Sequence, residues 1–482
     1  MFQQLKRLAS DTAVYGISTI IGRLLSFLLV PLYTHVLAPA EYGIVATVYS
    51  FIAFYTIVYS YGMESAYFRF AGMREIGTEK ENFSTPFLSY LATSVLLSGA
   101  LILFARPATT LFQLDASMER VCLYIAGILF FDTLELIPFA ALRLQRRAKF
   151  FATVKLLNIG INLVLSIYLL VSLRWGIDGI LLANLVASAV TFVVLLPFSW
   201  SQFAFVFRSD LYKEMLRFAL PLIPVALSGI VLQIADRPIL KYLVDDRSVG
   251  IYQANYRLGI FMAVITATFE YAWRPFFLSH AKDPNAKQLF SRVMTYYLLV
   301  TFSVFLVLCL FLPAFITHRF FGVSLIASQY WEGLPVVPWV LLGYIFSGIG
   351  TNLNAGIQIE KKTMYLLPTS LSGSVSNVLL NFVLVPVWGI MGAAYATTIG
   401  YAIVAVSLFV VVQRIYPIRY EYGRILKLVL TVAGALVLSH LLGGRFVVNL
   451  IVFVLWCGSL FGIRLFTAEE LTRMRSIVLR RT

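Results

Sequence analysis

Residues 175–200, with the sequence WGIDGILLANLVASAVTFVVLLPFSW, decide the class of fold. After Asp178 the stretch carries no charged side chain, and a helix needs about 20 mainly apolar residues to cross the hydrocarbon core of a bilayer. Its apolar residues are continuous rather than alternating, and open sheets cannot span lipid. We therefore predict a transmembrane helix over residues 177–200.

The whole chain has the same character. Of its 482 residues, 60% are hydrophobic and 13% are charged, and the mean hydropathy of +0.85 excludes a solvated surface of ordinary size. We predict an all-α integral membrane protein of about fourteen transmembrane helices, without a soluble domain large enough for chemistry. The helices are expected at about 11–36, 42–68, 85–105, 118–142, 151–173, 177–200, 214–240, 248–273, 292–316, 335–358, 363–386, 390–413, 422–442 and 446–466.

The basic residues divide unevenly between the two sides of this topology. Of the 38 Lys and Arg residues, 28 fall in segments on the side of the N-terminus and eight in the opposite loops, while Arg23 and Arg257 lie inside helices. Cytoplasmic loops carry the excess of Lys and Arg, so both termini are expected in the cytoplasm. This placement also indicates that the net charge of +15 reflects orientation in the membrane rather than binding of nucleic acid.

Internal repeats relate two parts of the chain. The motif Trp-Gly-Ile-x-Gly at 175–179 recurs at 388–392, and Pro31 and Gly43 align without a gap with Pro238 and Gly250. Six helices per copy is an even number, so two parallel six-helix halves are expected. The predicted division is 1–210 for helices 1–6, 211–415 for helices 7–12, and 416–482 for two further helices and a cytoplasmic tail.

This organisation, together with Ala-Pro-Ala-Glu-Tyr-Gly at 38–43, resembles the multidrug/oligosaccharidyl-lipid/polysaccharide (MOP) superfamily. The chain is most similar to its polysaccharide transporters, which flip undecaprenyl-diphosphate-linked repeat units of O-antigen, capsule or exopolysaccharide. The resemblance implies a V-shaped, MATE-like alternating-access carrier in the bacterial cytoplasmic membrane. It also implies as partners a lipid-linked oligosaccharide, membrane lipids, H⁺ or Na⁺ as coupling ion, and glycan polymerases.

Arg23 and Arg257 are the candidate binding residues for the cargo. A charge inside a transmembrane helix must face the protein interior or an aqueous cavity, and two cations without adjacent acids indicate an anionic cargo. The resemblance identifies this anion as a lipid-linked diphosphate, which a guanidinium binds through two hydrogen bonds. The alternative is that each arginine bonds backbone carbonyls at a helix break or pairs with Asp132 or Glu135.

Two sets of charges are candidates for gating. Glu64 with Arg69 and Glu270 with Arg274 lie at the cytoplasmic ends of helices 2 and 8, which correspond in the repeat. Such pairs form an inner gate if they exchange partners as the halves rock. The alternative is charge that reaches out to the interface.

Asp132 and Glu135 are the candidates for ion coupling. They lie three residues apart on helix 4, share a face and precede Pro138. Close carboxylates inside a membrane suit a proton-coupled carrier. The alternative is that they neutralise Arg23 or Arg257.

Each Trp-Gly motif follows a pair of asparagines at helical spacing, Asn158 with Asn162 and Asn377 with Asn381. These four are candidates for sugar contacts or, alternatively, for hydrogen bonds between helices. Asp236 and Arg237 precede Pro238, and we expect them to line the outer mouth of the carrier.

Other functions find less support in the sequence. No Gly-Lys dipeptide occurs, so an ATP-binding phosphate loop is absent, and the scattered Cys and His residues predict neither a metal site nor a cofactor. A membrane glycan polymerase needs a charged outer loop, whereas 317–334 holds only His318, Arg319 and Glu332, so we expect no enzyme. A lipid II-type flippase and a multidrug/toxin ion antiporter stay as alternatives. The first helix lacks the second arginine that lipid II flippases carry, which argues against the first alternative. Arginines inside the membrane would repel cationic drugs, which argues against the second.

Overall fold

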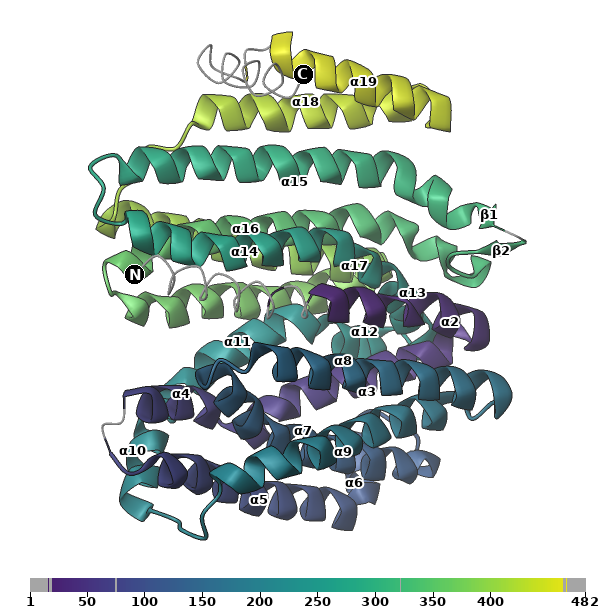
Figure 1. The fold of residues 1–482 in the computed structure, drawn as a ribbon. Helices are drawn as coiled ribbons and strands as arrows, with labels where there is room; N and C mark the ends of the chain where they lie inside the picture. Colours follow the sequence, from purple (N-terminus) through teal and green to yellow (C-terminus); the bar gives the residue numbers. More distant parts are fainter. Residues whose placement is uncertain (1–15, 17–19, 74–75, 321, 463–464, 466–482) are drawn as a thin grey trace. The chain divides into compact units, whose positions relative to one another are not determined.

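The computed structural model describes residues 16, 20–73, 76–320, 322–462 and 465. Their secondary structure is helical apart from one short β-hairpin (Figure 1). The start of the expected first helix and most of the C-terminal tail lie outside the described residues.

The elements follow one another along the chain, and helix Ile20–Val36 contains α2. The α-helices are α2 (Leu29–Val36), α3 (Pro39–Ser60), α4 (Met63–Met73), α5 (Glu79–Leu103), α6 (Ala105–Leu111), α7 (Glu119–Leu144), α8 (Ala148–Ile167), α9 (Gly176–Gln202), α10 (Ser209–Ala219), α11 (Ile223–Ile234), α12 (Asp236–Leu243), α13 (Asp246–Tyr256), α14 (Ile260–His280), α15 (Ala286–Thr317), α16 (Val337–Ile359), α17 (Leu366–Ile415), α18 (Tyr422–Leu441) and α19 (Phe446–Gly462). Short helical turns are η1 (Ala116–Met118), η2 (Tyr168–Ser172), η3 (Leu220–Leu222), η4 (Arg257–Gly259), η5 (Ser328–Val336) and η6 (Thr363–Tyr365), and β1 (Arg319–Phe320) pairs antiparallel with β2 (Val323–Ser324).

The helices account for the predicted number of spans. Among the described residues, ten helices are long and apolar enough to cross a membrane. One of these, Thr363–Ile415, contains two spans because the backbone leaves the helical conformation at Gly389 (φ 53°, ψ −128°). The shorter apolar helices Ile20–Val36 and Phe446–Gly462, and the successive helices α13, η4 and α14, bring the set to about fourteen. The predicted class of fold is confirmed.

The first glycine of the repeated Trp-Gly motif has a positive φ angle in both places. Gly176 has φ 55° and Gly389 has φ 53°, in the left-handed region that favours glycine. A Cβ at either position would meet open space, so the backbone conformation rather than packing requires glycine. Helix α9 begins at the first glycine, and the second span of α17 follows the other.

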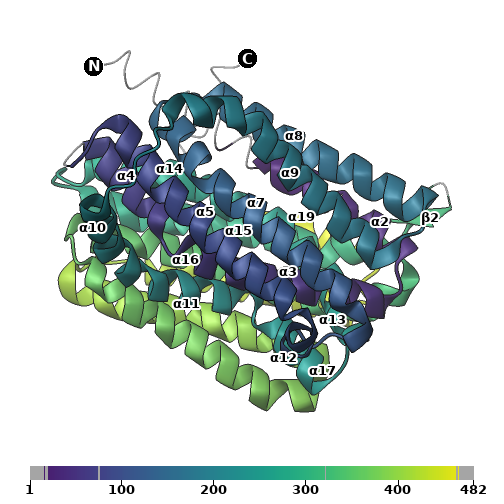
Figure 2. The ribbon, with the colours of Figure 1, turned by 90° about the horizontal axis from the view of Figure 1, so that it is seen from below.

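The chain packs as two compact units. Unit 1 consists of Met1–Ile260, Gln329–Val336 and Met364–Ile403, and unit 2 of Phe261–Ser328, Val337–Thr363 and Val404–Thr482. Within unit 1, α7 packs against α5 and α9, and α9 also packs against α8 (Figures 1 and 2). Within unit 2, α15 packs against α16, α18 and α19 (Figure 1). The two six-helix halves, with boundaries at 210 and 415, stay a prediction.

Helices α3 and α13 of unit 1 cross at two glycines that the repeat alignment pairs. A Cβ on Gly43 would lie 1.8 Å from the backbone oxygen of Asp246, and a Cβ on Gly250 would lie 1.8 Å from the backbone oxygen of Pro39. Both pairs of corresponding positions are offset by 207 residues, so exchanging the two repeats reproduces the contact. Only glycine allows two backbones to approach this closely.

The predicted helix over 42–68 is divided in the structure. Tyr61 and Gly62 have positive φ angles of 29° and 74°, which end α3 and start α4. The hydroxyl of Tyr90 on α5 spans the break, because it donates to the Ser60 carbonyl at 2.9 Å and accepts from the Glu64 N–H at 3.1 Å. The tertiary contact thus satisfies backbone groups that the interrupted helix leaves open.

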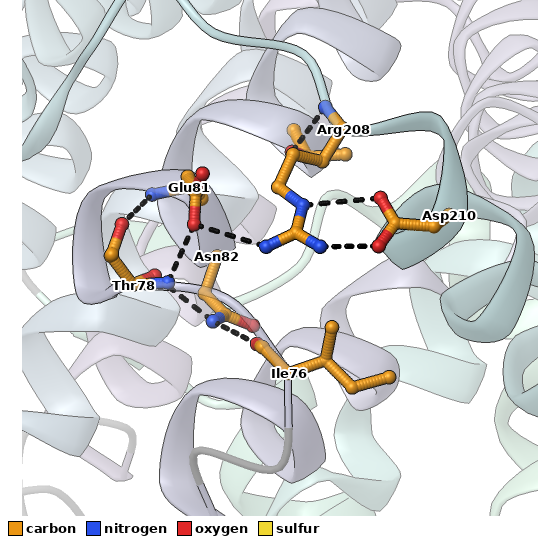
Figure 3. A network of polar contacts seen from close by, with 7 residues as sticks. Ile76, Thr78, Glu81, Asn82, Arg208 and Asp210 are labelled. Carbon is orange, nitrogen blue, oxygen red and sulfur yellow. Dashed lines mark hydrogen bonds and ion pairs between the residues drawn. The ribbon is translucent and has the colours of Figure 1, made fainter.

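The segment that joins α9 to α10 is tied to the start of α5. The Thr78 hydroxyl accepts from the Glu81 N–H, and the Glu81 carboxylate accepts from the Thr78 N–H, in a capping box. Arg208 reaches Glu81 at 3.5 Å and donates through Nε to Asp210 at 3.1 Å (Figure 3). The hydrogen bonds with Asp210 raise the pKa of Arg208 above its ordinary value. The contact of Arg208 with Glu81 links the segment after α9 to the start of α5.

Candidate functional site

A cavity of about 340 Å³ in unit 1 is lined by three cations, Arg23, Lys155 and Arg257. They come from the helix Ile20–Val36, from α8 and from the turn η4. The rest of the lining is uncharged: Gly22, Ser26, Phe151, Ile159 and Ile260. We call this cavity the cationic compartment.

The two predicted arginines therefore lie at one site. Within the described residues, neither forms an ion pair, so the alternative pairing with Asp132 or Glu135 is not observed there. Arg257 begins a 3₁₀ turn that interrupts the α-helical backbone between α13 and α14, as is common at functional hinges. Their role in binding an anion stays a prediction.

A second cavity, of about 190 Å³, adjoins the first because Ser26 and Arg257 line both. Its other polar side chains are three phenols and three amides. We call it the tyrosine–amide compartment, and these six residues are Tyr33, Tyr42, Tyr49, Asn162, Asn184 and Gln253.

Lys155 is the cation that the sequence interpretation missed. It was counted only among the basic residues on the side of the N-terminus. The structure places it in α8, with its ammonium 4.0 Å from the centre of the Phe139 ring. Its spacing from Asn158 and Asn162, three and seven residues, puts all three on one helix face. This spacing is the sequence signal that points to it.

The carboxylate pair interacts with Lys155. Both Asp132 and Glu135 of α7 feel its charge, and the Ser188 hydroxyl donates to Asp132. Glu135 is 4% exposed, and its buried Oε1 has no hydrogen-bond partner among the described residues. Lys155 thus lines the cationic compartment and is also within electrostatic range of the two carboxylates. The role of the two acids in ion coupling stays a prediction.

The gate candidates divide between the two units. Glu64 forms an ion pair with Arg143, and the Arg69 guanidinium lies 4.8 Å from the centre of the Phe218 ring. Residues five apart on a helix point in different directions, which explains why Glu64 turns to α7. In unit 2, Glu270 and Arg274 are both exposed on α14. Their function as a gate stays a prediction.

One asparagine of each pair bonds to the following span, and the other bonds within its own helix. The Asn158 amide donates to the Thr191 hydroxyl at 2.9 Å, and the Asn377 amide donates to the Thr397 hydroxyl at 3.2 Å. Asn381 is fully buried and donates to the Asn377 carbonyl at 2.9 Å. Of the four, Asn162 alone belongs to the lining of the two compartments.

The expectation that Asp236 and Arg237 line an outer mouth is wrong. Asp236 is fully buried, and its carboxylate pairs with Arg237 at 2.7 Å. It also accepts from the Tyr252 hydroxyl at 2.5 Å and the Thr397 hydroxyl at 3.2 Å. From the sequence, two adjacent charged residues are expected to be exposed to solvent. Here both are buried, and their ion pair and hydrogen bonds compensate the cost of burial.

Within the residues that the structure describes, no group of three or more His, Cys, Asp or Glu side chains is arranged to hold a metal ion. The linings of the two compartments place fixed positive charge beside neutral hydrogen-bonding groups. It suits a ligand with an anionic part next to a hydroxylated part.

Comparison with known proteins gives a family and a fold. The sequence profile of the family described as polysaccharide biosynthesis protein matches residues 33–332, more than half of the chain. No curated protein matches the chain.

Several solved structures are similar to it. The lipid II flippase MurJ in an inward closed conformation has a TM-score of 0.73 and 17% identity, over 93% of this chain and 99% of that one. An inward-facing multidrug resistance MATE family transporter of the MOP superfamily has a TM-score of 0.64 and 16% identity, over 84% and 95%. A MOP superfamily transporter from Pyrococcus furiosus has a TM-score of 0.56 and 16% identity, over the same shares. At such identities the likeness shows the fold alone.

Proposed function

Because the chain belongs to the polysaccharide biosynthesis protein family, we propose that it is a flippase for a lipid-linked oligosaccharide. The cargo is an undecaprenyl-diphosphate-linked repeat unit of O-antigen, capsule or exopolysaccharide. The protein moves it from the cytoplasmic to the outer leaflet by alternating access. It works in the bacterial cytoplasmic membrane with both termini in the cytoplasm, and an ion gradient, the membrane potential or the cargo gradient drives it.

The observation that carries this proposal is the cationic compartment. Three positive charges meet there without a carboxylate in the described lining, which favours a multiply charged anion. A diphosphate diester supplies two adjacent charges, and arginine binds such groups through paired hydrogen bonds. Each charge-assisted hydrogen bond contributes about 1.5–3 kcal/mol, or roughly 10- to 150-fold in affinity.

The same compartment argues against a multidrug/toxin antiporter for cationic drugs. Arg23, Lys155 and Arg257 would repel a cation at close range in a medium of low dielectric constant. A lipid II-type flippase shares the diphosphate, so the charge of the compartment does not separate it from the proposed function. The absence of the second arginine on the first helix favours the oligosaccharide carrier.

The proposal is tested by export in a host that lacks its own carrier. Replacing Arg23, Lys155 or Arg257 by alanine should abolish display of the glycan on the cell surface while the protein level stays normal. Arg23→Lys should restore it only in part, because a point charge replaces a planar fork. Arg120→Ala is the matched control, because Arg120 is exposed at the start of α7 and lies outside the compartment.

Normal export by Arg23→Ala and Arg257→Ala would rule out anion binding in this compartment. Loss of export by Arg120→Ala to the same extent would mean that any removed charge disturbs the protein. Export of a peptidoglycan precursor in place of the glycan would favour the lipid II-type alternative.

A further inference from the structure

We propose that the tyrosine–amide compartment is a subsite for one uncharged sugar ring, the ring attached directly to the diphosphate. This inference rests on the proposed function, because it assumes that the cationic compartment holds the diphosphate. The protein then selects its cargo by the sugar next to the lipid carrier, and the rest of the repeat unit lies outside this subsite.

Each of the three amides in the compartment forms a hydrogen bond to the protein through only one of its two polar atoms. Ser166 donates to Oδ1 of Asn162 at 3.1 Å, Nδ2 of Asn184 donates to the Tyr49 hydroxyl at 3.1 Å, and Oε1 of Gln253 accepts from Arg237 at 3.0 Å. The opposite end of each amide has no protein partner among the described residues. One end fixes the side chain, and the other is available to a hydroxyl group of a ligand.

The orientation of Gln253 is determined by its neighbour. A guanidinium donates hydrogen bonds and cannot accept them, so the amide must present Oε1 to Arg237 and keep Nε2 as a free donor. Arg237 itself is held by the buried carboxylate of Asp236. The Gln253 donor is therefore already positioned before a ligand enters, which reduces the cost of ordering it on binding.

Size and shape indicate a single ring. The volume of about 190 Å³ lies below the roughly 300–1,000 Å³ of pockets that hold drug-sized ligands, and it equals about six water molecules at ~30 Å³ each. The rings of Tyr33 and Tyr42 meet edge to face with centroids 5.8 Å apart and supply apolar surface for the C–H groups of a sugar.

The order of the two compartments matches the order of groups in the cargo. Arg257 lines both compartments, so a phosphate bound there has its next substituent in the tyrosine–amide compartment. Arg257 is also the only charged residue among its described lining. This excludes an aminated, cationic ring by repulsion and leaves hydroxyl or amide groups as the features that the site recognises.

The test measures binding to the purified full chain by titration calorimetry. The probes are farnesyl diphosphate capped as its methyl diester, so that it carries the same two charges as the cargo, and the same lipid diphosphate carrying one glucose, galactose or N-acetylglucosamine. Farnesyl diphosphate in this test means the capped form. We expect the best of the three sugar probes to bind about tenfold more tightly than farnesyl diphosphate, since two modest hydrogen bonds supply such a factor. This ratio is the readout, because changes that affect only the diphosphate cancel in it.

Asn162→Leu should reduce the ratio to near one and leave the affinity for farnesyl diphosphate unchanged. Asn158→Leu is the matched control, because Asn158 lies one turn away on the same helix and bonds to Thr191 outside the lining. Gln253→Glu provides a second variant that keeps the acceptor for Arg237, loses the free donor and adds a negative charge. It should also bring the ratio to near one, even if the new charge weakens both probes.

Equal binding of all four probes to the wild type would overturn the subsite and leave the anion site standing. Failure of the wild type to bind farnesyl diphosphate would overturn the proposed function instead. An equal loss of the ratio in Asn158→Leu and Asn162→Leu, or an unchanged ratio in both compartment variants, would likewise overturn the assignment.

Discussion

Replacing Gly43 by alanine should open the outer end of the cavity. Gly43 of α3 and Gly250 of α13 cross at the predicted outer ends of helices 2 and 8, beside the Tyr42 side chain that lines the tyrosine–amide compartment. A Cβ on Gly43 would lie 1.8 Å from the Asp246 carbonyl oxygen, whereas real Cβ contacts are essentially never under 3.0 Å. The two backbones must therefore separate by at least 1.2 Å, the difference between these distances.

The size of the effect follows from this overlap. The obstacle is a backbone atom, which cannot rotate away as a flexible side chain does, and overpacking of this kind costs about 1–3 kcal/mol. The penalty applies to the closed outer end and disappears when the helices part. It should shift the equilibrium towards the open form by roughly 5- to 150-fold. Gly250→Ala should shift the equilibrium by a similar factor. The free-energy shift of the double variant should be smaller than the sum of the two single shifts, because one separation of the helices relieves both contacts.

The shift is measured as the reaction of a single cysteine with a membrane-impermeant maleimide. Ser26→Cys, in a background without Cys122, Cys309 and Cys457, reports from both compartments. Labelling from outside should accelerate in Gly43→Ala and Gly250→Ala. Gly229→Ala on α11 is the control, because its Cβ would meet nothing within 4 Å. If Gly43→Ala keeps its fold and labels at the wild-type rate, the glycine crossing does not close the cavity.

Three further predictions address topology, coupling and the outer closure. A cysteine in place of Lys361 should react only from the cytoplasmic side, and outward labelling would contradict the fourteen-helix topology. The double change Asp132→Asn and Glu135→Gln should bind farnesyl diphosphate several-fold more tightly and remove the pH dependence of transport in liposomes, because Lys155 is released to the cargo. A lower melting temperature with unchanged pH response would give the acids a structural role only. Tyr330→Phe removes the 3.0 Å hydrogen bond to the Leu37 carbonyl, worth about 0.5–1.5 kcal/mol, and should speed outside labelling of Ser26→Cys by roughly two- to tenfold. A rate equal to the wild type would exclude Tyr330 from the closure.

Much of the fold could be predicted from the sequence because a lipid bilayer allows few kinds of structure to span it. Continuous apolar runs predict helices, and the uneven division of Lys and Arg tests their number independently. The repeat motifs carried further information, since Gly176 and Gly389 both have a positive φ angle and Gly43 and Gly250 share a contact. The match to the polysaccharide biosynthesis protein family over residues 33–332 and the fold shared with transporters of the MOP superfamily agree with the predicted resemblance.

The site was less predictable because it depends on which helix faces which. Lys155 was counted only among the basic residues on the side of the N-terminus, yet it lines the cationic compartment. Glu64 was expected to act with Arg69, but its ion pair is with Arg143, far away in the sequence. The buried carboxylate of Asp236 accepts hydrogen bonds from Tyr252 and Thr397. These partners are distant in the sequence, so the residues next to Asp236 do not predict them.

Helix α13 and the turn η4 that follows it place the glycine crossing and the proposed binding groups on a single face. Gly250, Gln253 and Arg257 follow one another at spacings of three and four residues, so the closing glycine, the proposed sugar contact and the proposed phosphate contact form one stripe. The positions related to the last two by the repeat are Ala46 and Ser50, which carry neither an amide nor a charge. Both repeats thus contribute a glycine to the crossing of α3 and α13, whereas only the second repeat carries the proposed polar binding groups of this stripe. A cargo that draws Arg257 towards its phosphate acts two helical turns from Gly250, and we expect such a displacement to loosen the glycine crossing.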